Sequence, residues 1–290
     1  MKVRFAVSVG LGPPDPAALA AVCTSAEAKG FDTLWLSDVP SVPSTEPTLG
    51  VAYAAAVTRR VRLGVNFIPF GSTPYLVAHR LAQLDQLSGG RLLVTLVPGL
   101  DLPGERDRLG TAGRHRGRLM DEVIPELRNL WSGADLPVKP VQEPLELWLG
   151  GSGPEAVARA GRLSDGWLGS MVSPRRAGEI RAGILAAADA AGRSVDPEHF
   201  GLSIGYARDA SGLEAAARTR LRAVRPRRED LDPGVDPSDL VPVGADSLGR
   251  LVSRLVDEGL TKFVLRPVAP VADWDAELDW LAEAVLALQT

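Results

Sequence analysis

Residues 144–170, PLELWLGGSGPEAVARAGRLSDGWLGS, contain a strand, a helix and a second strand in close succession. The apolar run Leu145–Leu149 predicts a short buried strand, and Pro154–Leu163 predicts a helix that begins at a proline. A second short apolar run, Gly166–Ser170, follows the helix. This order of elements is the unit from which parallel sheets are built.

The same alternation of short apolar runs and longer helical stretches extends over the whole chain. Six further strands are predicted at Arg4–Val9, Thr33–Ser37, Arg62–Ile68, Arg91–Val97, Leu202–Tyr206 and Lys262–Arg266. Helices are predicted between them at Pro16–Lys29, Thr48–Thr58, Pro74–Leu87, His115–Trp131, Arg176–Ala191, Leu213–Val224 with Ser247–Glu258, and Trp274–Leu288. Eight strands that each precede a helix predict an α/β fold, a single (β/α)₈ TIM barrel over residues 1–290.

Size and composition agree with one soluble globular unit. The chain has 290 residues, of which 45% are hydrophobic and 23% are charged, and one barrel commonly occupies about 250 residues. The net charge of −4 gives no overall positive field that would attract nucleic acid or anionic lipid. The opening MKVRFAVSVG reads as a first strand and is too short for a signal peptide or a membrane span. Cys23 has no second cysteine to pair with, so we expect a cytoplasmic protein.

One region departs from the repeating pattern. Residues 225–243 are rich in proline, aspartate and glycine and show no clear periodicity. The region is long for an ordinary loop, so we predict either a lid beside the site or a surface insertion. The preceding basic stretch, Arg218–Arg228, has no interleaved aromatic residues and reads as a solvated helix end.

Barrels of this kind build their sites from the loops that follow the carboxyl ends of the strands. The second predicted strand ends at Asp38, the third at Asn66 and Phe67, and the eighth at Arg266. Asp38 is the candidate polar group at this edge, although many such aspartates only cap the following turn. Trp35, Trp148 and Trp167 lie on predicted strands, where packing in the core is the default expectation.

The segment from Gly150 to Ala156 carries the clearest signal for a ligand. A strand runs into Gly150-Gly151-Ser152-Gly153, and a helix starts at the next residue. Glycines let the backbone approach an anion, and the free amides at a helix start favour phosphate. The segment also spells G-x-G-x-x-A, but Ser170 to Pro174, where a dinucleotide site needs an acid, contain none. A glycine-rich turn with no ligand is the alternative.

Other kinds of site find little support in the sequence. His79, His115 and His199 fall on predicted helices or at a strand start, and we expect no close acidic or thiol partner for them. No group of residues has the spacing of a metal site, and no nucleophile elbow or Walker loop occurs.

Six ordered blocks of sequence resemble the luciferase-like monooxygenase family, and within it the actinobacterial oxidoreductases that use the deazaflavin coenzyme F420. The blocks are GFDTLWLSD at 30–38, EPTLGVAYAAAVTRRVRLG at 46–64, LAQLDQLSGGRLLV at 81–94, RGRLMDEVIPELRNLWSG at 116–133, the opening segment at 144–170, and VGADSLGRLVSRLVDEGLTKFVLRP at 243–267. The resemblance implies a luciferase-like barrel that binds F420, or alternatively FMN, and acts on a small-molecule substrate. It also suggests a homodimer.

The resemblance further implies where the cofactor lies. The double glycine and the end of the sixth strand would bind its phosphate, which points to Gly150, Gly151, Ser152 and Ser170, with Arg175 or Arg176 as charge partner. Relatives often carry a non-proline cis peptide behind the flavin ring, and Asn66-Phe67 occupies the matching place.

Two departures from the family bear on the chemistry. Val39 stands where many members have a histidine, and Leu100 stands where sugar-oxidising relatives have an acid. A sugar-dehydrogenase mechanism with a histidine base and a glutamate acid is therefore not expected. The leading hypothesis is an F420-dependent oxidoreductase with Asp38 as the polar group at the ring or substrate. An FMN-dependent monooxygenase, a cofactor-binding barrel without catalysis, and a cofactor-free barrel with its pocket filled by Phe67, Phe70 and Pro98 are the alternatives.

Overall fold

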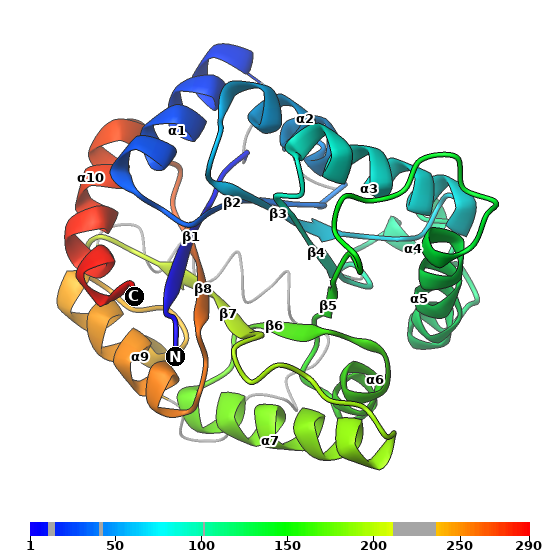
Figure 1. Cartoon of the computed structure of the whole chain (residues 1–290). Helices are drawn as coiled ribbons and strands as arrows, with labels where there is room; N and C mark the ends of the chain where they lie inside the picture. Colours follow the sequence, from blue (N-terminus) through cyan, green and yellow to red (C-terminus); the bar gives the residue numbers. More distant parts are fainter. Residues whose placement is uncertain (11–14, 41–42, 101, 211–235) are drawn as a thin grey trace.

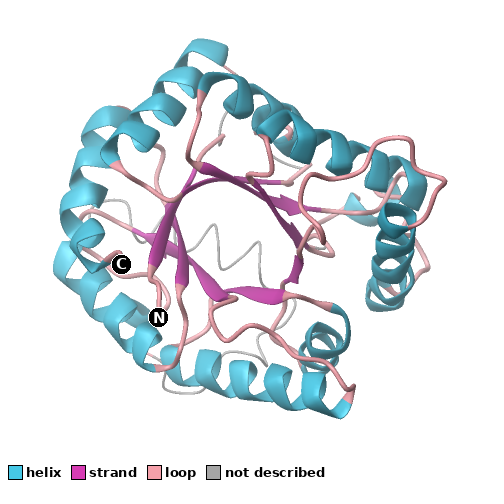
Figure 2. Ribbon diagram, viewed as in Figure 1, coloured by secondary structure: helices cyan, strands magenta, loops and turns pink. Residues whose placement is uncertain are grey.

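The computed structural model describes residues 1–10, 15–40, 43–100, 102–210 and 236–290, and in it eight strands form a closed parallel barrel in chain order. Figure 1 follows the chain around the ring, and Figure 2 shows the helices packed outside it. The strands are β1 (Arg4–Ser8), β2 (Thr33–Ser37), β3 (Arg62–Phe67), β4 (Leu92–Leu96), β5 (Leu147–Leu149), β6 (Gly166–Ser170), β7 (Phe200–Tyr206) and β8 (Lys262–Pro267). The predicted (β/α)₈ barrel is confirmed.

The helices follow the predicted order with boundaries shifted by a few residues. They are α1 (Pro16–Lys29), α2 (Pro47–Val57), α3 (Pro74–Ser88), α4 (Glu105–Arg108), α5 (Arg116–Ser132), α6 (Pro154–Leu163), α7 (Pro174–Ala190), α9 (Ala245–Asp257), α10 (Trp274–Val285) and the 3₁₀ turns η2 (Pro237–Asp239) and η3 (Leu286–Leu288). The short helix α4, between β4 and α5, is an element that the apolar pattern does not predict.

Several predictions from the sequence fall outside the described residues: the helix Leu213–Val224, the basic stretch, and residues 225–235 of the expected lid or insertion. The described end of that region is attached to the barrel wall. Asp239 forms an ion pair with Arg254 of α9, and Val243 bridges in parallel to Ala207 just after β7.

Alternation along the strands divides the side chains into two sets. Phe263 and Leu265 of β8 belong to the large cluster that packs against the helices, and so do Phe5 and Val7 of β1. A second cluster contains one residue from each of six strands, Ala6, Trp35, Leu93, Trp148, Leu168 and Val264, and fills the inside of the ring. Because neighbouring residues of a strand point to opposite faces, this pattern identifies which positions face inward along each strand.

Two indoles close the middle of the barrel, and inward glycines make room for them. A Cβ atom at Gly64 would lie 2.1 Å from the Trp35 ring, and one at Gly166 would lie 2.5 Å from the Trp148 ring. Both tryptophans are almost fully buried. The expectation that Trp35, Trp148 and Trp167 pack in the core is confirmed.

The amino ends of the strands carry a charged floor below this layer. Lys262 of β8 is buried and donates through Nζ to Asp32 Oδ2 at 2.5 Å and to Thr33 Oγ1 at 2.8 Å. Arg4 of β1 adds a second ion pair to Asp32 at 3.4 Å. The inward positions at this end are therefore held by compensated charges, as a buried ammonium requires.

A glycine at the end of α1 offers a test of the helix boundaries. Gly30 caps α1 with φ of 92°, whereas Gly249 lies inside α9 with no heavy atom within 4 Å of an added Cβ. We expect Gly30→Ala to lower the free energy of unfolding by about 1 kcal/mol, because alanine is strained at positive φ. We expect Gly249→Ala to raise it by about 0.5–1 kcal/mol, because alanine favours the helix. Urea unfolding of both variants checks this, and equal effects of the two changes would contradict it.

Among the described residues, no helix combines the length and apolar character needed to cross a membrane.

Candidate active site

Polar side chains form a row across the carboxyl ends of β2, β3 and β4. Ser37 pairs with Asn66, and Asn66 pairs with Thr95, so the three lie side by side on the inner face. Asn66 Nδ2 donates to Ser37 Oγ at 3.0 Å. Asn66 Oδ1 and Thr95 Oγ1 are both buried and have no hydrogen-bond partner among the residues that the structure describes. Buried polar atoms are normally satisfied, so this row presents unused hydrogen-bonding capacity toward the mouth of the barrel.

Asp38 follows β2 at the rim of the mouth. Its backbone N–H donates to the Asn66 carbonyl at 2.9 Å, and its Oδ2 accepts a long hydrogen bond of 3.4 Å from the Ile68 amide. Burial raises the pKa of the Asp38 carboxyl to about 6, and the negative charges of Glu46 and Glu105 act in the same direction. The carboxyl therefore changes its protonation state close to neutral pH, as a proton-transfer group must.

The expected cis peptide at Asn66–Phe67 is wrong. In the described residues the cis peptide is Glu143–Pro144, and Asn66 and Phe67 both pair in regular register with β4. The Phe67 side chain is 3% exposed and belongs to the helix-facing cluster. The backbone of Phe67 is therefore part of the barrel wall, and its ring packs outward against the helices, away from the mouth.

A buried ion pair supports the connection that follows β4. Glu105 is 1% exposed, and its Oε2 lies 3.0 Å from Nη1 of Arg116, the first residue of α5. Glu105 Oε1 accepts the Leu100 amide at 3.3 Å, and a Cβ atom at Gly99 would lie 3.0 Å from Oε2. This acid lies beside the loop where Leu100 replaces the expected carboxylate, but Arg116 holds it in place.

In the glycine turn after β5, the carbonyls of Gly151 and Ser152 accept side-chain hydrogen bonds, and the Gly150 amide donates to the Leu96 carbonyl at 3.4 Å. Trp167 Nε1 donates to the Gly151 carbonyl at 2.8 Å, and Arg176 donates to the Ser152 carbonyl at 3.1 Å. Helix α6 begins at Pro154, its N-cap is Gly153, and no side chain caps it. Gly151 has φ of 107°, and a Cβ there would lie 2.8 Å from that of Ala156. The carbonyls of Gly151 and Ser152 are thus held by hydrogen bonds, and no side chain caps the start of α6. A helix start of this kind is suited to binding a phosphate.

The end of β6 lies close to this turn. Ser170 is exposed, and the next residue, Met171, has a φ of 58°, which is rare for a residue with a side chain. Arg175 and Arg176 of α7 both pair with Glu179, at 2.5 and 3.1 Å, and Arg176 also donates to the turn itself. Of the two arginines considered from the sequence, the structure places Arg176 in contact with the predicted phosphate site.

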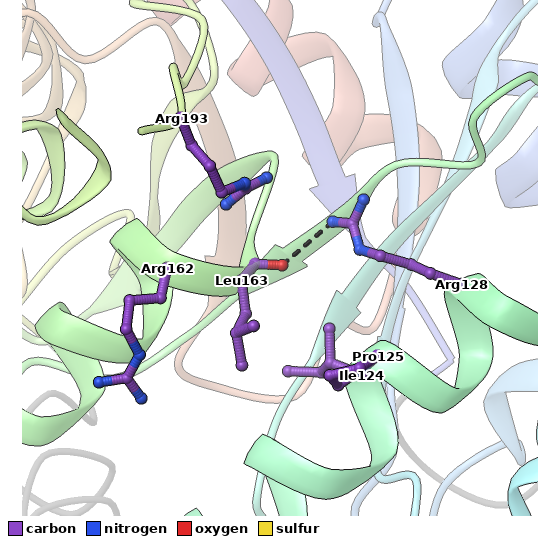
Figure 3. A pocket seen from close by; sticks show the side chains of 6 residues that line it. All are labelled: Ile124, Pro125, Arg128, Arg162, Leu163 and Arg193. Carbon is purple, nitrogen blue, oxygen red and sulfur yellow. Dashed lines mark hydrogen bonds between the residues drawn. The ribbon is translucent and has the colours of Figure 1, made fainter. Parts of the chain in front are cut away.

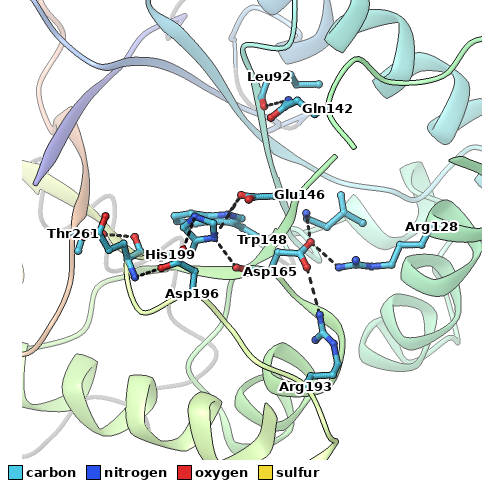
Figure 4. A network of polar contacts seen from close by, with 12 residues as sticks. Leu92, Arg128, Gln142, Glu146, Trp148, Asp165, Arg193, Asp196, His199 and Thr261 are labelled. Atoms are coloured by element: carbon cyan, nitrogen blue, oxygen red, sulfur yellow. Dashed lines mark hydrogen bonds and ion pairs between the residues drawn. The ribbon is translucent and has the colours of Figure 1, made fainter. Parts of the chain in front are cut away.

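His199 lies at the amino ends of the strands, whereas His115 is the N-cap of α5 and lies beside the start of α6. For these two histidines the expectation of no close acidic partner is wrong. His199 Nδ1 is 3.6 Å from Glu146 and its Nε2 is 3.9 Å from Asp196, while His115 is 3.9 Å from Glu155. Figure 4 shows His199 beside Trp148, with the two rings tilted by 34° and their centroids 5.4 Å apart. In the same region Asp165 joins Arg128 and Arg193. Glu146 and Glu155 are distant in sequence from the histidines that they meet, whereas Asp196 is only three residues before His199.

A pocket outside the barrel does not coincide with this site. It is lined by Ile124, Pro125, Arg128, Arg162, Leu163 and Arg193, and Figure 3 shows Arg128 directed at the Leu163 carbonyl, to which it donates at 3.0 Å. The pocket lies beside the carboxyl end of α6, at the level where the strands begin. We place the site at the opposite end of the strands, where the polar row and the glycine turn meet. The described residues contain no group of three or more potential metal ligands.

Sequence comparison relates the chain to known oxidoreductases. The model of the family described as luciferase-like monooxygenase matches residues 1–243. A protein of Mycobacterium tuberculosis, provisionally named as a coenzyme F420-dependent oxidoreductase, is 29% identical over 197 residues, which cover 58% of this chain and 55% of that one. A 5,10-methylenetetrahydromethanopterin reductase of Methanolobus tindarius is 25% identical over 276 residues, covering 86% and 82%. The chain thus spans about half the length of the first of these relatives and most of the second.

Solved structures give the same architecture. An F420-dependent secondary alcohol dehydrogenase, solved in complex with an F420-acetone adduct, superposes with a TM-score of 0.81 over 100% of both chains at 20% identity. At that identity the likeness concerns the fold. The family match covers most of the sequence and includes the glycine turn and the polar row. The chain therefore belongs to the luciferase-like monooxygenase family.

Proposed function

We propose that the chain is an oxidoreductase that binds coenzyme F420 at the barrel mouth and transfers a hydride between it and a small organic molecule. The observation that carries the proposal is the turn at Gly150–Ser152, whose carbonyls are held back by Trp167 and Arg176. F420-dependent relatives support the choice of deazaflavin, and FMN is the alternative cofactor.

The residues at the mouth fit a phosphorylated ring cofactor. The phosphate would lie at the amides of the turn, where the dipole of α6 and Arg176 supply positive potential. Across the mouth, the unpartnered Asn66 Oδ1 and Thr95 Oγ1 would meet the polar edge of the ring. Among the described residues, the Asn66 and Thr95 oxygens have no hydrogen-bond partner and no side chain caps the start of α6, so each end of such a molecule would find a group able to bind it.

The cofactor supplies the hydride chemistry, and the protein orients the reactants and moves protons. Trp35 and Trp148 close the barrel beneath the mouth and keep water out from below. Asp38 is the group that would donate or accept the accompanying proton, because burial raises its pKa to about 6. In this scheme Asn66 and Thr95 position the reacting ring.

A cofactor-binding protein without catalysis is the second candidate. It is favoured by one observation: Val39 and Leu100 stand at the usual proton-transfer positions, and the nearby Glu105 is held by Arg116. A protein of this kind would retain the phosphate turn and bind the cofactor tightly without turnover.

Titration of the purified protein with reduced F420 and, separately, with reduced FMN tests the proposal. We expect saturable binding of both by fluorescence or absorbance, with the deazaflavin bound more tightly. Turnover over a broad panel of small carbonyl, alkene and alcohol compounds then distinguishes the enzyme from the binding protein. A protein that bound neither cofactor would contradict both candidates.

A further inference from the structure

Arg266 faces the inside of the barrel near its mouth. On β8, Phe263 and Leu265 pack outward against the helices, while Val264 belongs to the cluster that fills the ring. Alternation therefore directs Lys262, Val264 and Arg266 inward at successive levels. Lys262 lies at the floor of the barrel, so Arg266, four residues further along the strand, lies at the active-site end.

The guanidinium of Arg266 has no partner among the described residues. Its Nε is buried and makes no hydrogen bond, and the side chain forms no ion pair there. Lys262, on the same face of the same strand, is fully compensated by Asp32 and Thr33. The Arg266 side chain is only partly buried, so its terminal nitrogens are open to a ligand, while its buried Nε–H is costly to leave without an acceptor. An arginine keeps its positive charge in a protein. The site is therefore built for an anion that the described residues do not supply.

The neighbouring strands β7 and β1 carry no acidic residue at the level of Arg266 that could form an ion pair with it. The register pairs Arg266 with Gly205 of β7, and the inward residue one level below on that strand is Ser203. On the other side, β1 pairs Ala6 with Val264, so Ser8 follows at the level of Arg266. The inward residues of the two flanking strands nearest to Arg266 are therefore Gly205, Ser203 and Ser8. The planar fork of a guanidinium matches the two oxygens of a carboxylate or phosphate.

We propose that Arg266 binds the carboxylate or phosphate of an acidic organic substrate. This inference rests on the proposed function and specifies the class of substrate for the same site. The glycine turn lies on β5 and α6, with β6 and β7 between it and β8. A cofactor phosphate at the turn and an acid at Arg266 therefore occupy different arcs of the mouth. An acidic group on the tail of the cofactor has the same chemistry, and the experiment separates the two sources.

Inorganic phosphate is the probe. We titrate it by calorimetry into the protein alone, into FMN-loaded protein and into F420-loaded protein, because the phosphate of either cofactor would occupy the turn. Arg266→Met should weaken the remaining phosphate binding by about tenfold or more, and Arg266→Lys should fall between. Arg250→Gln, which removes an exposed arginine on α9, should leave it unchanged.

Each outcome decides the assignment. Arg266-dependent binding that persists with both cofactors supports an acidic substrate. Arg266-dependent binding that F420 abolishes gives the site to the cofactor and overturns the substrate class. Equal binding by wild type and Arg266→Met in every arm overturns the anion site. If neither cofactor binds, the proposed function fails, and the titration of the protein alone still decides whether Arg266 holds an anion.

Thermal unfolding in phosphate-free buffer provides a second measurement that does not depend on ligand. Removing an uncompensated charge should leave the Tm of Arg266→Met equal to that of wild type or higher. A clear fall in Tm would show that Arg266 has a structural partner, which would contradict the proposal.

Discussion

Asp38→Asn is expected to lose about 100-fold in kcat against any acceptor that the wild type turns over, because a positioned acid or base commonly contributes that much. The limb of the wild-type pH profile near pH 6 should disappear in the variant, since burial raises the pKa of this carboxyl to about 6. Activity falls below that pH if Asp38 accepts the proton and above it if Asp38 donates it. Steady-state kinetics between about pH 5 and pH 8, a range that brackets this pKa, measure both the loss in kcat and the change in the pH profile. Wild-type kcat in the variant would leave Asp38 without a role in proton transfer.

The same substitution should stabilise the fold, which separates a catalytic effect from damage. A carboxyl whose pKa is raised in the folded state binds more protons than it does in the unfolded chain, so its favourable contribution is present at low pH and is lost as the pH rises through about 6. A rise from 3.8 to about 6 corresponds to about 3 kcal/mol, which solvent screening of this half-buried group reduces to about 1–2 kcal/mol.

We therefore expect Asp38→Asn to raise the free energy of unfolding by about 1–2 kcal/mol at pH 7 and to match the wild type near pH 4, as linkage requires. Urea unfolding at several pH values measures this difference. Asp135→Asn is the control, since Asp135 is exposed and the substitution should give no such pH dependence. A variant that is less stable than wild type at pH 7 would contradict the assigned environment.

Gly151→Ala is expected to weaken cofactor binding by about 30- to 100-fold, or about 2–3 kcal/mol. The backbone at Gly151 has φ of 107°, and the new Cβ would lie 2.8 Å from that of Ala156, so the turn must change conformation. The hydrogen bond from Trp167 to the Gly151 carbonyl would then be lost, and the amides would no longer converge on the phosphate.

Gly153→Ala is the matched control for this variant. Gly153 lies two residues further along the same turn, has an ordinary φ of −74°, and has no heavy atom within 4 Å of an added Cβ. The affinity of the Gly153→Ala variant for F420 and FMN should stay within about threefold of wild type, because the substitution introduces no backbone strain. Fluorescence titration compares the two. Equal losses would indicate that the turn does not hold the phosphate.

The barrel could be predicted from the sequence because its determinants are local. A buried parallel strand such as FVLRPV and a helix such as α1, which ends at Gly30, each show their pattern within a few residues. The glycine turn could be located for the same reason, since a strand end, four residues and a helix start are contiguous.

The parts that could not be predicted depend on pairs that only the closed ring brings together. His199, just before β7, meets Glu146, just before β5, and Arg128 of α5 meets Asp165, just before β6. The ion pair of Glu105 with Arg116 is closer in sequence but depends on the short helix α4, which the apolar pattern does not predict. The unpartnered state of Arg266 is likewise a property of its surroundings rather than of its neighbours in sequence. The sequence shows an arginine at the end of an apolar strand, but it does not show whether that arginine has an acidic partner in the folded chain.

The indole layer of Trp35 and Trp148 separates the charged floor of the barrel from its mouth. Trp35 relies on the missing side chain of Gly64, and Trp148 on that of Gly166, so each bulky residue is matched to a small one on an adjacent strand. Because the indole layer lies between the charged floor and the mouth, we expect substitutions at Lys262 or Asp32 to change mainly the free energy of unfolding, and substitutions at the mouth to change mainly ligand binding. Residues at the mouth could therefore change during evolution, and with them the substrate, without changes in the charged floor, provided that the pairs Trp35–Gly64 and Trp148–Gly166 are both kept.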